Sequence, residues 1–548
     1  MKWRTSLLIT GIFIAYGALV SNLYNLQLTN SSYYSAKAES QDRSAGFLQA
    51  ERGDIYFVDK NDNLIPAAIN KDYPNIYAVP EEIVDLATTS LMLSEILELD
   101  EEEIRNKLNK PGDLYELLVA KASAEQVDRV VAADIDGIYL DRQEFRFYPF
   151  NELAAHVIGF VSPNENDNSI NGRYGVELYF DTELRGKLGK LDDSGNRGDA
   201  LAPTDGKDIV LTIDRNIQAR AEEVLGRLIE KYSAVSGTVI VQDPKTGRIL
   251  ALGNYPTFNP NEYSEYPIKN FLNPAVQAIY EPGSIFKVIT MASGLDSGRL
   301  TPDDKYYDNG SVTLNSRTIR NWDLKGHGWV TMTEIIEQSI NTGAVFAQQK
   351  VGRDIFYDYL VKFGFGGPTA INLPGELTGS LANLEGNTRD INFATASFGQ
   401  GVSVTPIGLI SAISTIANDG VLMRPLIRRD ELPTPANRVL SAAAADQVTA
   451  MMASAVRKAQ VAQIPNYEIA GKTGTAQVPN FGKGGYTDDV IDTYAGFAPA
   501  TNPRFVILIK IDKPYGAPHA ALTVVPAFRE LAEFLLNYYN IGPDSLER

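Results

Sequence analysis

The chain has 548 residues, more than one ordinary domain holds, and this length predicts two or three domains. Apolar residues make up 44% and charged residues 22%, which is the usage of a globular protein with enough material for a core. The formal charge of −18 argues against nucleic acid as a partner, because an acidic chain is repelled by phosphate backbones. The absence of cysteine excludes disulfides, thiolate catalysis and Cys-ligated zinc, and the 3 histidines stand in unrelated contexts. We therefore expect no metal and no cofactor.

The N-terminal segment predicts a membrane anchor. Lys2 and Arg4 precede a stretch without charged residues that ends at Lys37, and residues 5–28 within it are mostly apolar. As a helix, this segment would span about 36 Å, which is enough to cross the hydrocarbon core. A cleaved signal peptide usually has a shorter apolar region, and a buried soluble helix rarely follows a basic terminus. The positive-inside rule then predicts that residues 1–4 are cytoplasmic and that the bulk of the chain is periplasmic or extracellular.

Residues 29–204 predict an elongated mixed β/α domain without candidate chemistry. The segment 52–59 has the pattern of a short strand followed by a turn. From about residue 81 to 133 the chain becomes acidic and helical in pattern, so we expect a helical insertion there. Within it, residues 123–126 have the form of a capping box.

Residues 205–548 predict an α+β domain. The local patterns indicate strands at 208–213, 237–242, 248–253, 468–476 and 505–511, and helices at 214–232 and 525–541. Strands at both ends of a region with many helices between them favour a central antiparallel sheet flanked by helices.

The first motif that carries chemistry is Glu281–Lys287. Pro282 and Gly283 break the preceding structure, so Ser284 is expected at a helix N-terminus, where unpaired N–H groups favour developing negative charge. Lys287 follows one turn later on the same face. A serine hydroxyl needs a neighbouring base, and a lysine can serve when burial keeps it neutral. Alone, this spacing is weak, since many helices combine a capping serine with an exposed lysine.

Two further motifs indicate a function only in combination with the first, which they follow along the chain. In Ser339–Asn341, the Ser339 hydroxyl could relay a proton and the Asn341 amide could hold a substrate amide. In the predicted strand at residues 472–475, Gly474 allows close backbone approach, while Lys472, Thr473 and Thr475 offer donors to a carboxylate. A nucleotide loop ending at Lys472 is excluded, because Asn466 stands where that motif needs a glycine.

The three motifs together resemble those of penicillin-binding proteins and serine β-lactamases, with Ser284, Ser339 and Lys472 separated by 55 and 133 residues. The flanking sequence is similar to penicillin-binding proteins over nearly the whole chain, and the segments that carry this similarity are Arg52–Ile55, Arg146–Pro149, Gly175–Glu177, Leu211–Asp214, Glu281–Ser284, Ser397–Gly401 and Thr405–Pro406. The first three resemble the non-catalytic pedestal, or dimerisation-like domain, of the class B members. No glycosyltransferase domain fits the N-terminal part, which argues against class A.

Within class B, Gly471–Gln477 resembles the division-specific type more than the elongation-specific type. Ile340 departs from the family, which often has a second serine there, but Ser339 and Asn341 remain in register.

The resemblance implies a reaction. Ser284 would attack the penultimate carbonyl of a D-Ala-D-Ala stem peptide, expel D-alanine and form an acyl-enzyme, which an amine from a neighbouring stem would resolve into a cross-link. The backbone N–H groups of Ser284 and Thr475 would form the oxyanion hole. The resemblance further implies acylation by β-lactams, a role in septal wall synthesis, and partners that include a membrane-embedded glycan polymerase and other division proteins.

Two other functions remain open on sequence grounds. A carboxypeptidase or β-lactamase-like hydrolase of the same fold would need a general base for water, and none can be assigned. A β-lactam sensor or scaffold without enzymatic activity would need an intracellular signalling part, for which only about four cytoplasmic residues are available by the helix-length argument. The three functions differ in whether an amine, water or neither resolves the acyl-enzyme.

Overall fold

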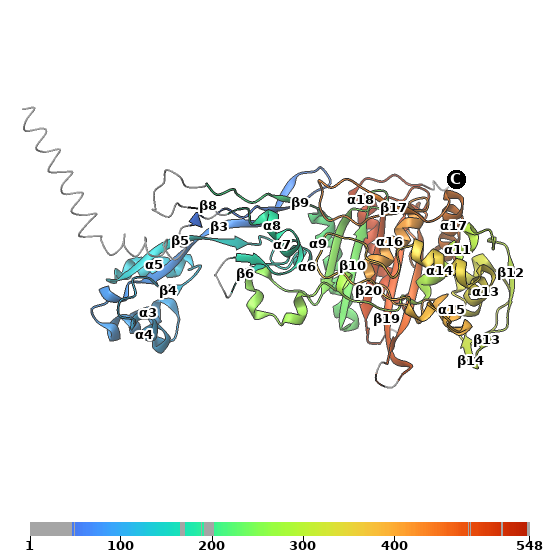
Figure 1. Cartoon of the computed structure of the whole chain (residues 1–548), viewed down its shortest axis with the longest axis horizontal. Helices are drawn as coiled ribbons and strands as arrows, with labels where there is room; N and C mark the ends of the chain where they lie inside the picture. Colours follow the sequence, from blue (N-terminus) through green and yellow to red (C-terminus); the bar gives the residue numbers. More distant parts are fainter. Residues whose placement is uncertain are drawn as a thin grey trace, which may run out of the picture. The chain divides into compact units, whose positions relative to one another are not determined.

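The computed structural model describes residues 47–48, 50–164, 170–187, 189–190, 202–480, 482, 484–516 and 519–544 (Figure 1). It divides into two compact units. The first comprises the described residues within Met1–Gly53, Ile69–Phe147 and Arg185–Lys207, and the second those within Asp54–Ala68, Tyr148–Leu184 and Asp208–Arg548. Helices of this part of the chain are too short or too polar to cross a bilayer. The predicted cytoplasmic tail, residues 1–4, and the anchor, residues 5–28, lie outside the described residues.

The first unit is built on a long antiparallel ribbon. The distal part of β3 (Leu64–Ala78) pairs with β5 (Ile138–Phe147), from Ile69 opposite Phe147 to Ala78 opposite Ile138. The helices of this unit are α3 (Leu86–Leu97), α4 (Glu101–Leu108) and α5 (Ala124–Ala133). Their apolar faces and Ile76 of the ribbon form one core.

The stretch 81–133 also contains a strand that the sequence pattern did not predict. This strand, β4 (Glu116–Val119), pairs with the end of β3. The predicted capping box is present: the Ser123 hydroxyl accepts from the Gln126 N–H, and the Gln126 side chain accepts from the Ser123 N–H.

The second unit contains a five-stranded antiparallel sheet in the order β11-β10-β20-β19-β18. Its strands are β10 (Ser236–Gln242), β11 (Ile249–Tyr255), β18 (Ala470–Pro479), β19 (Tyr486–Ala498) and β20 (Phe505–Asp512). The predicted central antiparallel sheet is thereby confirmed, although the sequence pattern missed β19. β18 forms an edge of the sheet and therefore has one side of its backbone free of a neighbouring strand.

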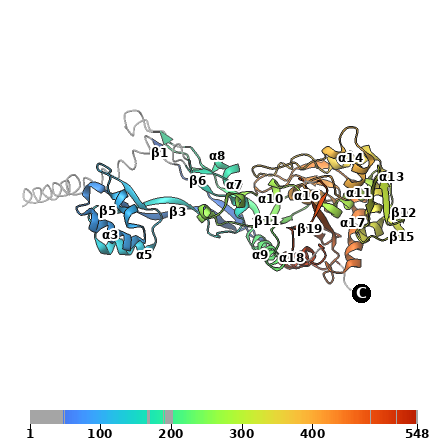
Figure 2. The same ribbon diagram turned by 90° about the horizontal axis from the view of Figure 1, so that it is seen from below.

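Helices cover both faces of this sheet because successive side chains of a strand point in opposite directions. Val239 and Val241 belong to a core with α9 (Arg215–Tyr232) and α18 (Val524–Tyr538), which are neighbours in Figure 2. Ile240, between them, belongs to the core on the other face. That face is covered by further helices, α11 (Phe286–Asp296), α16 (Pro406–Ala417) and α17 (Ala442–Ala459).

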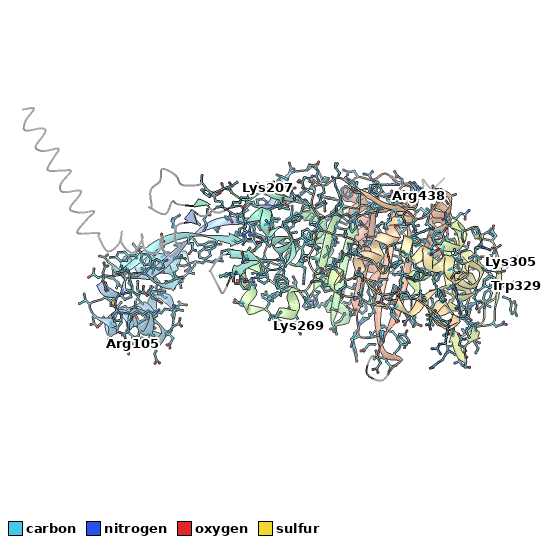
Figure 3. The ribbon with its side chains drawn as sticks, in the orientation of Figure 1. Arg105, Lys207, Lys269, Lys305, Trp329 and Arg438 are labelled. Atoms are coloured by element: carbon cyan, nitrogen blue, oxygen red, sulfur yellow. The ribbon has the colours of Figure 1, made fainter. Side chains whose placement is uncertain are left out.

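A small lobe follows α11. It contains two hairpin-like pairs, formed by β12 (Lys305–Asp308) with β15 (Gly328–Thr331) and by β13 (Ser311–Leu314) with β14 (Arg317–Arg320). Figure 3 labels Lys305 and Trp329 on this lobe. Helices α12 (Met332–Gln338) and α13 (Asn341–Val351) follow directly, so the lobe leads into the second motif.

One predicted strand does not join the central sheet. β9 (Ile209–Asp214) pairs in parallel with β2 (Ile55–Val58), a strand from the N-terminal part of the chain. The turn after β2 is also attached to the second unit, where the N–H of Lys60 donates to the hydroxyl of Tyr538 at 3.2 Å. The predicted cap of α9 is present, since Asp214 accepts from the N–H groups of Asn216 and Ile217. The second unit is therefore assembled from three separate pieces of sequence.

Candidate active site

The proposed nucleophile lies in a tight turn packed against the edge strand. A single 3₁₀ turn, η5 (Gly283–Ile285), leads into α11, so Ser284 stands at the beginning of a helical segment and is partly exposed. Gly283 has φ of +59°, and a Cβ there would lie 3.2 Å from the carbonyl oxygen of Thr475. Glycine fits this position because it adopts positive φ without strain and brings the turn close to β18.

Lys287 is fully buried one helical turn after Ser284. Its Nζ donates to the carbonyl oxygen of Ser339 at 2.5 Å and lies 3.1 Å from the Ser339 hydroxyl oxygen. Neither of these partners is a carboxylate, and burial without a carboxylate disfavours an ammonium group. The site therefore favours the neutral amine that a base requires.

Ser339 is placed by an unusual backbone conformation. It ends α12 with φ of +58°, in the left-handed region, and Asn341 then begins α13. The Nδ2 of Asn341 donates to the carbonyl oxygen of Arg320 at 2.9 Å. Since this bond uses an amide donor, the Asn341 carbonyl oxygen is the group that can accept from a substrate N–H.

Lys472 approaches the same hydroxyl from β18. Its Nζ donates to the Ser339 hydroxyl oxygen at 3.1 Å, and it also contacts Thr473 at the carbonyl oxygen, 3.2 Å, and at Oγ1, 3.3 Å. The Ser339 hydroxyl thus stands between two lysine nitrogens. If it accepts from Lys472, it can donate its own proton toward a neutral Lys287, which gives a path for proton transfer.

Burial and charge give the two lysines different pKa values. Burial, followed by the positive charge of Lys472, holds the pKa of Lys287 well below its usual range. Burial lowers the pKa of Lys472 to about 8. At neutral pH the arrangement therefore favours a neutral Lys287 beside a mostly charged Lys472.

The third motif contacts the nucleophile turn directly. A Cβ at Gly474 would lie 2.7 Å from the carbonyl oxygen of Pro282, so this position has room only for glycine. Thr475 uses its hydroxyl within the protein, donating to the carboxylate of Asp492 at 3.1 Å and accepting from the N–H of Ala520 at 3.2 Å. The Thr475 side chain is therefore fixed by the protein.

The structure brings the three motifs together around Ser339, and it adds neighbours that the sequence analysis missed. Asp492 is buried on the unpredicted strand β19 and also accepts from Thr523. Trp322, from the lobe, and His519, after β20, have rings 5.8 Å apart, and the indole N–H of Trp322 donates to the carbonyl oxygen of Gln338, next to the second motif. Only the three-dimensional contacts identify these residues, since they lie outside the three sequence motifs.

No metal site competes with this chemistry in the part of the chain that the structure describes, where no three His, Asp or Glu side chains gather in a way that could hold an ion. The nitrogens of Lys287 and Lys472 have hydroxyl and carbonyl partners there. The arrangement suits nucleophilic catalysis by serine with lysine as the base.

Comparison with known proteins agrees with this chemistry. Residues 237–533 match the family described as Penicillin binding protein transpeptidase domain, and residues 47–211 match the Penicillin-binding Protein dimerisation domain. The chain is 32% identical to Stage V sporulation protein D of Bacillus subtilis, over 86% of this chain and 75% of that protein. It is 28% identical to the Probable peptidoglycan D,D-transpeptidase PenA of Neisseria meningitidis, over 98% of this chain and 93% of that protein.

A solved structure is similar as well. The crystal structure of Penicillin binding protein 3 from Mycobacterium tuberculosis, complexed with aztreonam, has a TM-score of 0.70 and 28% sequence identity. The similarity covers 91% of this chain and 98% of that chain.

The coupling between the two lysines can be tested without substrate. Replacing Lys472 by Met should raise the pKa of Lys287, because the neighbouring positive charge is removed while the site stays buried. The titration of ¹³C-labelled lysine Cε resonances measures this pKa, and Lys287→Met identifies the signal by its loss. An unchanged titration of Lys287 in Lys472→Met would show that the two groups are not coupled.

Proposed function

Because the chain belongs to the class B penicillin-binding proteins, which combine a dimerisation domain with a transpeptidase domain, we propose that it is a serine D,D-transpeptidase of peptidoglycan. Its substrates would be stem peptides, with a D-Ala-D-Ala donor and an amine acceptor. The observation that carries the proposal is the convergence of Lys287 and Lys472 on the Ser339 hydroxyl. Lys287 lies one helical turn after Ser284. β-Lactams would acylate the same serine.

Acylation follows from the positions of these groups. The Ser284 oxygen attacks the penultimate D-Ala carbonyl carbon while its proton passes to the neutral Nζ of Lys287. The C–N bond to the terminal D-alanine then breaks, and the leaving nitrogen receives a proton from Lys287 through the Ser339 hydroxyl. With a β-lactam, the ring C–N bond breaks instead and the leaving group stays attached.

Backbone N–H groups would stabilise the negative charge that develops on the carbonyl oxygen during this step. The N–H groups of Ser284 and Thr475 would donate to the oxyanion, and losing one such donor typically costs about 100- to 1,000-fold in rate. Lys472 and the Thr473 hydroxyl would bind the terminal carboxylate of the donor. The Asn341 carbonyl oxygen would accept from an amide of the stem.

Deacylation repeats the chemistry in reverse. The acceptor amine attacks the acyl carbon, the bond to Ser284 Oγ breaks, and the proton of the amine returns to Ser284 through Lys287. A hydrolytic outcome needs a group that activates water. Among the described residues, the hydrogen-bond partners of the two lysine nitrogens include no carboxylate.

The proposal extends to location and partners. We infer a single-pass protein of the inner membrane, held by residues 5–28, whose bulk is periplasmic or extracellular. The uncharged stretch after Lys2 and Arg4 supports this location. Similarity to Stage V sporulation protein D and to a protein named as a peptidoglycan D,D-transpeptidase FtsI homolog supports a septal role. Partners would be a membrane-embedded glycan polymerase and other division proteins.

Removing the nucleophile gives the direct test of function. Ser284→Ala should abolish covalent labelling by fluorescent penicillin, because the acyl bond forms at the hydroxyl that this change removes. Its thermal unfolding should remain nearly unchanged, since Ser284 is partly exposed and lies in a preformed turn. Labelling is read by gel fluorescence and peptide mapping, and a labelled Ser284→Ala protein would refute the assignment. Loss of D-alanine with formation of an amine-linked product by the wild type separates transpeptidation from hydrolysis.

The two lysines should respond differently to arginine. Lys287→Arg should lose acylation almost completely, because guanidinium does not deprotonate at working pH and cannot act as base. Lys472→Arg should keep a measurable fraction, because this position needs positive charge and donors. In the wild type the rate should fall as pH rises through about 8, where Lys472 loses its proton, and Lys472→Arg should shift this fall to higher pH. Second-order acylation rates with penicillin across neutral and alkaline pH measure both effects, and equal rates for the two variants would contradict the roles assigned.

Protease accessibility tests the proposed location. Protease added outside spheroplasts should digest nearly the whole chain, and N-terminal sequencing of the intact protein should begin near Met1. A mature N-terminus after the apolar segment would instead show a cleaved signal peptide. Protection of the chain from external protease would place the catalytic domain on the wrong side of the membrane.

A further inference from the structure

Glu281, three residues before the nucleophile, connects two parts of the site. One carboxylate oxygen accepts from the N–H of Gly401 at 2.9 Å, and the other accepts from the hydroxyl of Tyr486 at 3.0 Å. Gly401 belongs to the segment after α15 (Asp390–Ala396), whereas Tyr486 begins β19. The carboxylate therefore joins the nucleophile turn to two distant segments.

The turn is held on one side by the backbone. Tyr280 and Val404 exchange N–H···O bonds of 3.0 and 2.9 Å, and the N–H of Gly283 donates to Gly399 at 3.2 Å. The approach is close, since a Cβ at Gly399 would lie 2.2 Å from the Gly283 carbonyl oxygen. The Glu281–Gly401 bond adds to this already rigid side.

The opposite side faces the hairpin of β18 and β19 and is held differently. There Gly283 and Gly474 allow close contact between the turn and β18. The Tyr486–Glu281 hydrogen bond joins residues 280–284 to the start of β19 in this hairpin. It therefore restrains the position of the hairpin relative to the turn.

The hairpin connects Tyr486 to Thr475, with a register shift in β18 between Gln477 and Pro479. Tyr486 stands opposite Pro479 in the β18–β19 register, and Pro479 follows Thr475 by four residues along β18. The ends of the two strands are tied, because the N–H of Asn480 donates to Gly485 at 2.8 Å and the hydroxyl of Thr487 to Val478 at 3.2 Å. A ring of short connections thus runs from Ser284 through Glu281, Tyr486 and β18 to Thr475.

The surroundings of the pair favour a durable bond. Glu281 is half-buried, and burial raises its pKa, while burial and the nearby Glu281 raise the pKa of the Tyr486 hydroxyl. The phenol consequently remains a donor at physiological pH. Tyr486 is 40% exposed, so its hydroxyl, rather than deep packing, connects it to the turn.

We propose that Glu281 and Tyr486 are positioning residues that fix the spacing between Ser284 and Thr475, and with it the oxyanion hole. This proposal rests on the proposed transpeptidase function, because it assigns the N–H groups of Ser284 and Thr475 as the oxyanion donors. Such donors act over a narrow range of about 2.7–3.1 Å from the oxyanion. A misplacement of about 1 Å can cost about 100-fold in rate.

Variants of Glu281 and Tyr486 test the contributions of the Tyr486 hydroxyl, the Glu281 carboxylate and the hydrogen bond between them to the acylation rate. Tyr486→Phe removes one hydrogen bond and keeps the ring, so the acylation rate constant at saturating penicillin should fall about tenfold. Glu281→Ala removes both bonds and should cost about 100-fold. Glu281→Gln should stay within about threefold, because its amide can accept from Gly401 and donate to the Tyr486 oxygen. The double variant Glu281→Ala/Tyr486→Phe should be no slower than Glu281→Ala, since both changes break the same connection.

Tyr307→Phe is the matched control. Tyr307 is 51% exposed, its ring contacts Trp329 on the lobe, and its hydroxyl has no partner among the described residues. Stopped-flow acylation gives the rate constant and the dissociation constant of the initial complex separately. The proposal expects the rate constant to fall in Tyr486→Phe with little change in the dissociation constant, and no change in Tyr307→Phe.

Three results would overturn the proposal: a Tyr486→Phe rate equal to that of Tyr307→Phe, a loss confined to the dissociation constant, or losses that multiply in the double variant. Should Glu281→Ala fail to fold, Tyr486→Phe and Glu281→Gln still decide the question. If wild-type protein is not acylated at Ser284 at all, the proposed function fails instead, and this outcome is distinct from a failed positioning role.

Discussion

The active site depends on the burial of two lysines that share one hydroxyl group. Two ammonium groups in this position would repel each other and lose their hydration, so one must give up its proton more readily than a solvated lysine does. The deeper lysine, Lys287, lies on a helix and contacts carbonyl and hydroxyl oxygens, whereas Lys472 reaches the hydroxyl from an edge strand where a substrate carboxylate could join it. The same charge pattern thus creates a base and an anion site.

The secondary structure positions the serines and lysines of the site at the ends and edges of its elements. Ser284 occurs where a 3₁₀ turn becomes a helix, Ser339 where one helix ends and another begins, and Lys472 on the free edge of a sheet. Each position lies at the end or edge of an element, where backbone groups lack internal partners. The helices α11, α16 and α17 on one face of the sheet and α9 and α18 on the other keep these ends fixed in relation to one another. Rigid packing away from the site therefore supplies the preorganisation that the reaction requires.

Local sequence patterns were enough to predict those elements whose conformation is determined by residues adjacent in the sequence. The order of the motifs was enough to propose Ser284, Lys287 and Ser339 as neighbours, and β-branched runs were enough to predict β10 and β20. The pattern missed β19 because the strand begins with polar residues, and Asp488, Asp489 and Asp492 conceal the apolar half that follows. The placement of β9 was also inaccessible, because its partner β2 lies far earlier in the chain and no local pattern specifies a parallel neighbour. The contacts of Asp492 and Tyr486 likewise join segments distant in sequence.

The long ribbon in the first unit begins and ends at paired residues, and this pairing determines how insertions and deletions within the unit are tolerated. Ile69 and Phe147 face each other across an antiparallel pair, so the polypeptide leaves the second unit and returns to it at neighbouring positions. Everything between them is, in topological terms, an inserted module. Closing a loop costs only about 0.6 kcal/mol more for each doubling of its length. Its helices and turns can therefore be lengthened, shortened or exchanged at little cost in loop-closure entropy, which leaves this segment free to diversify.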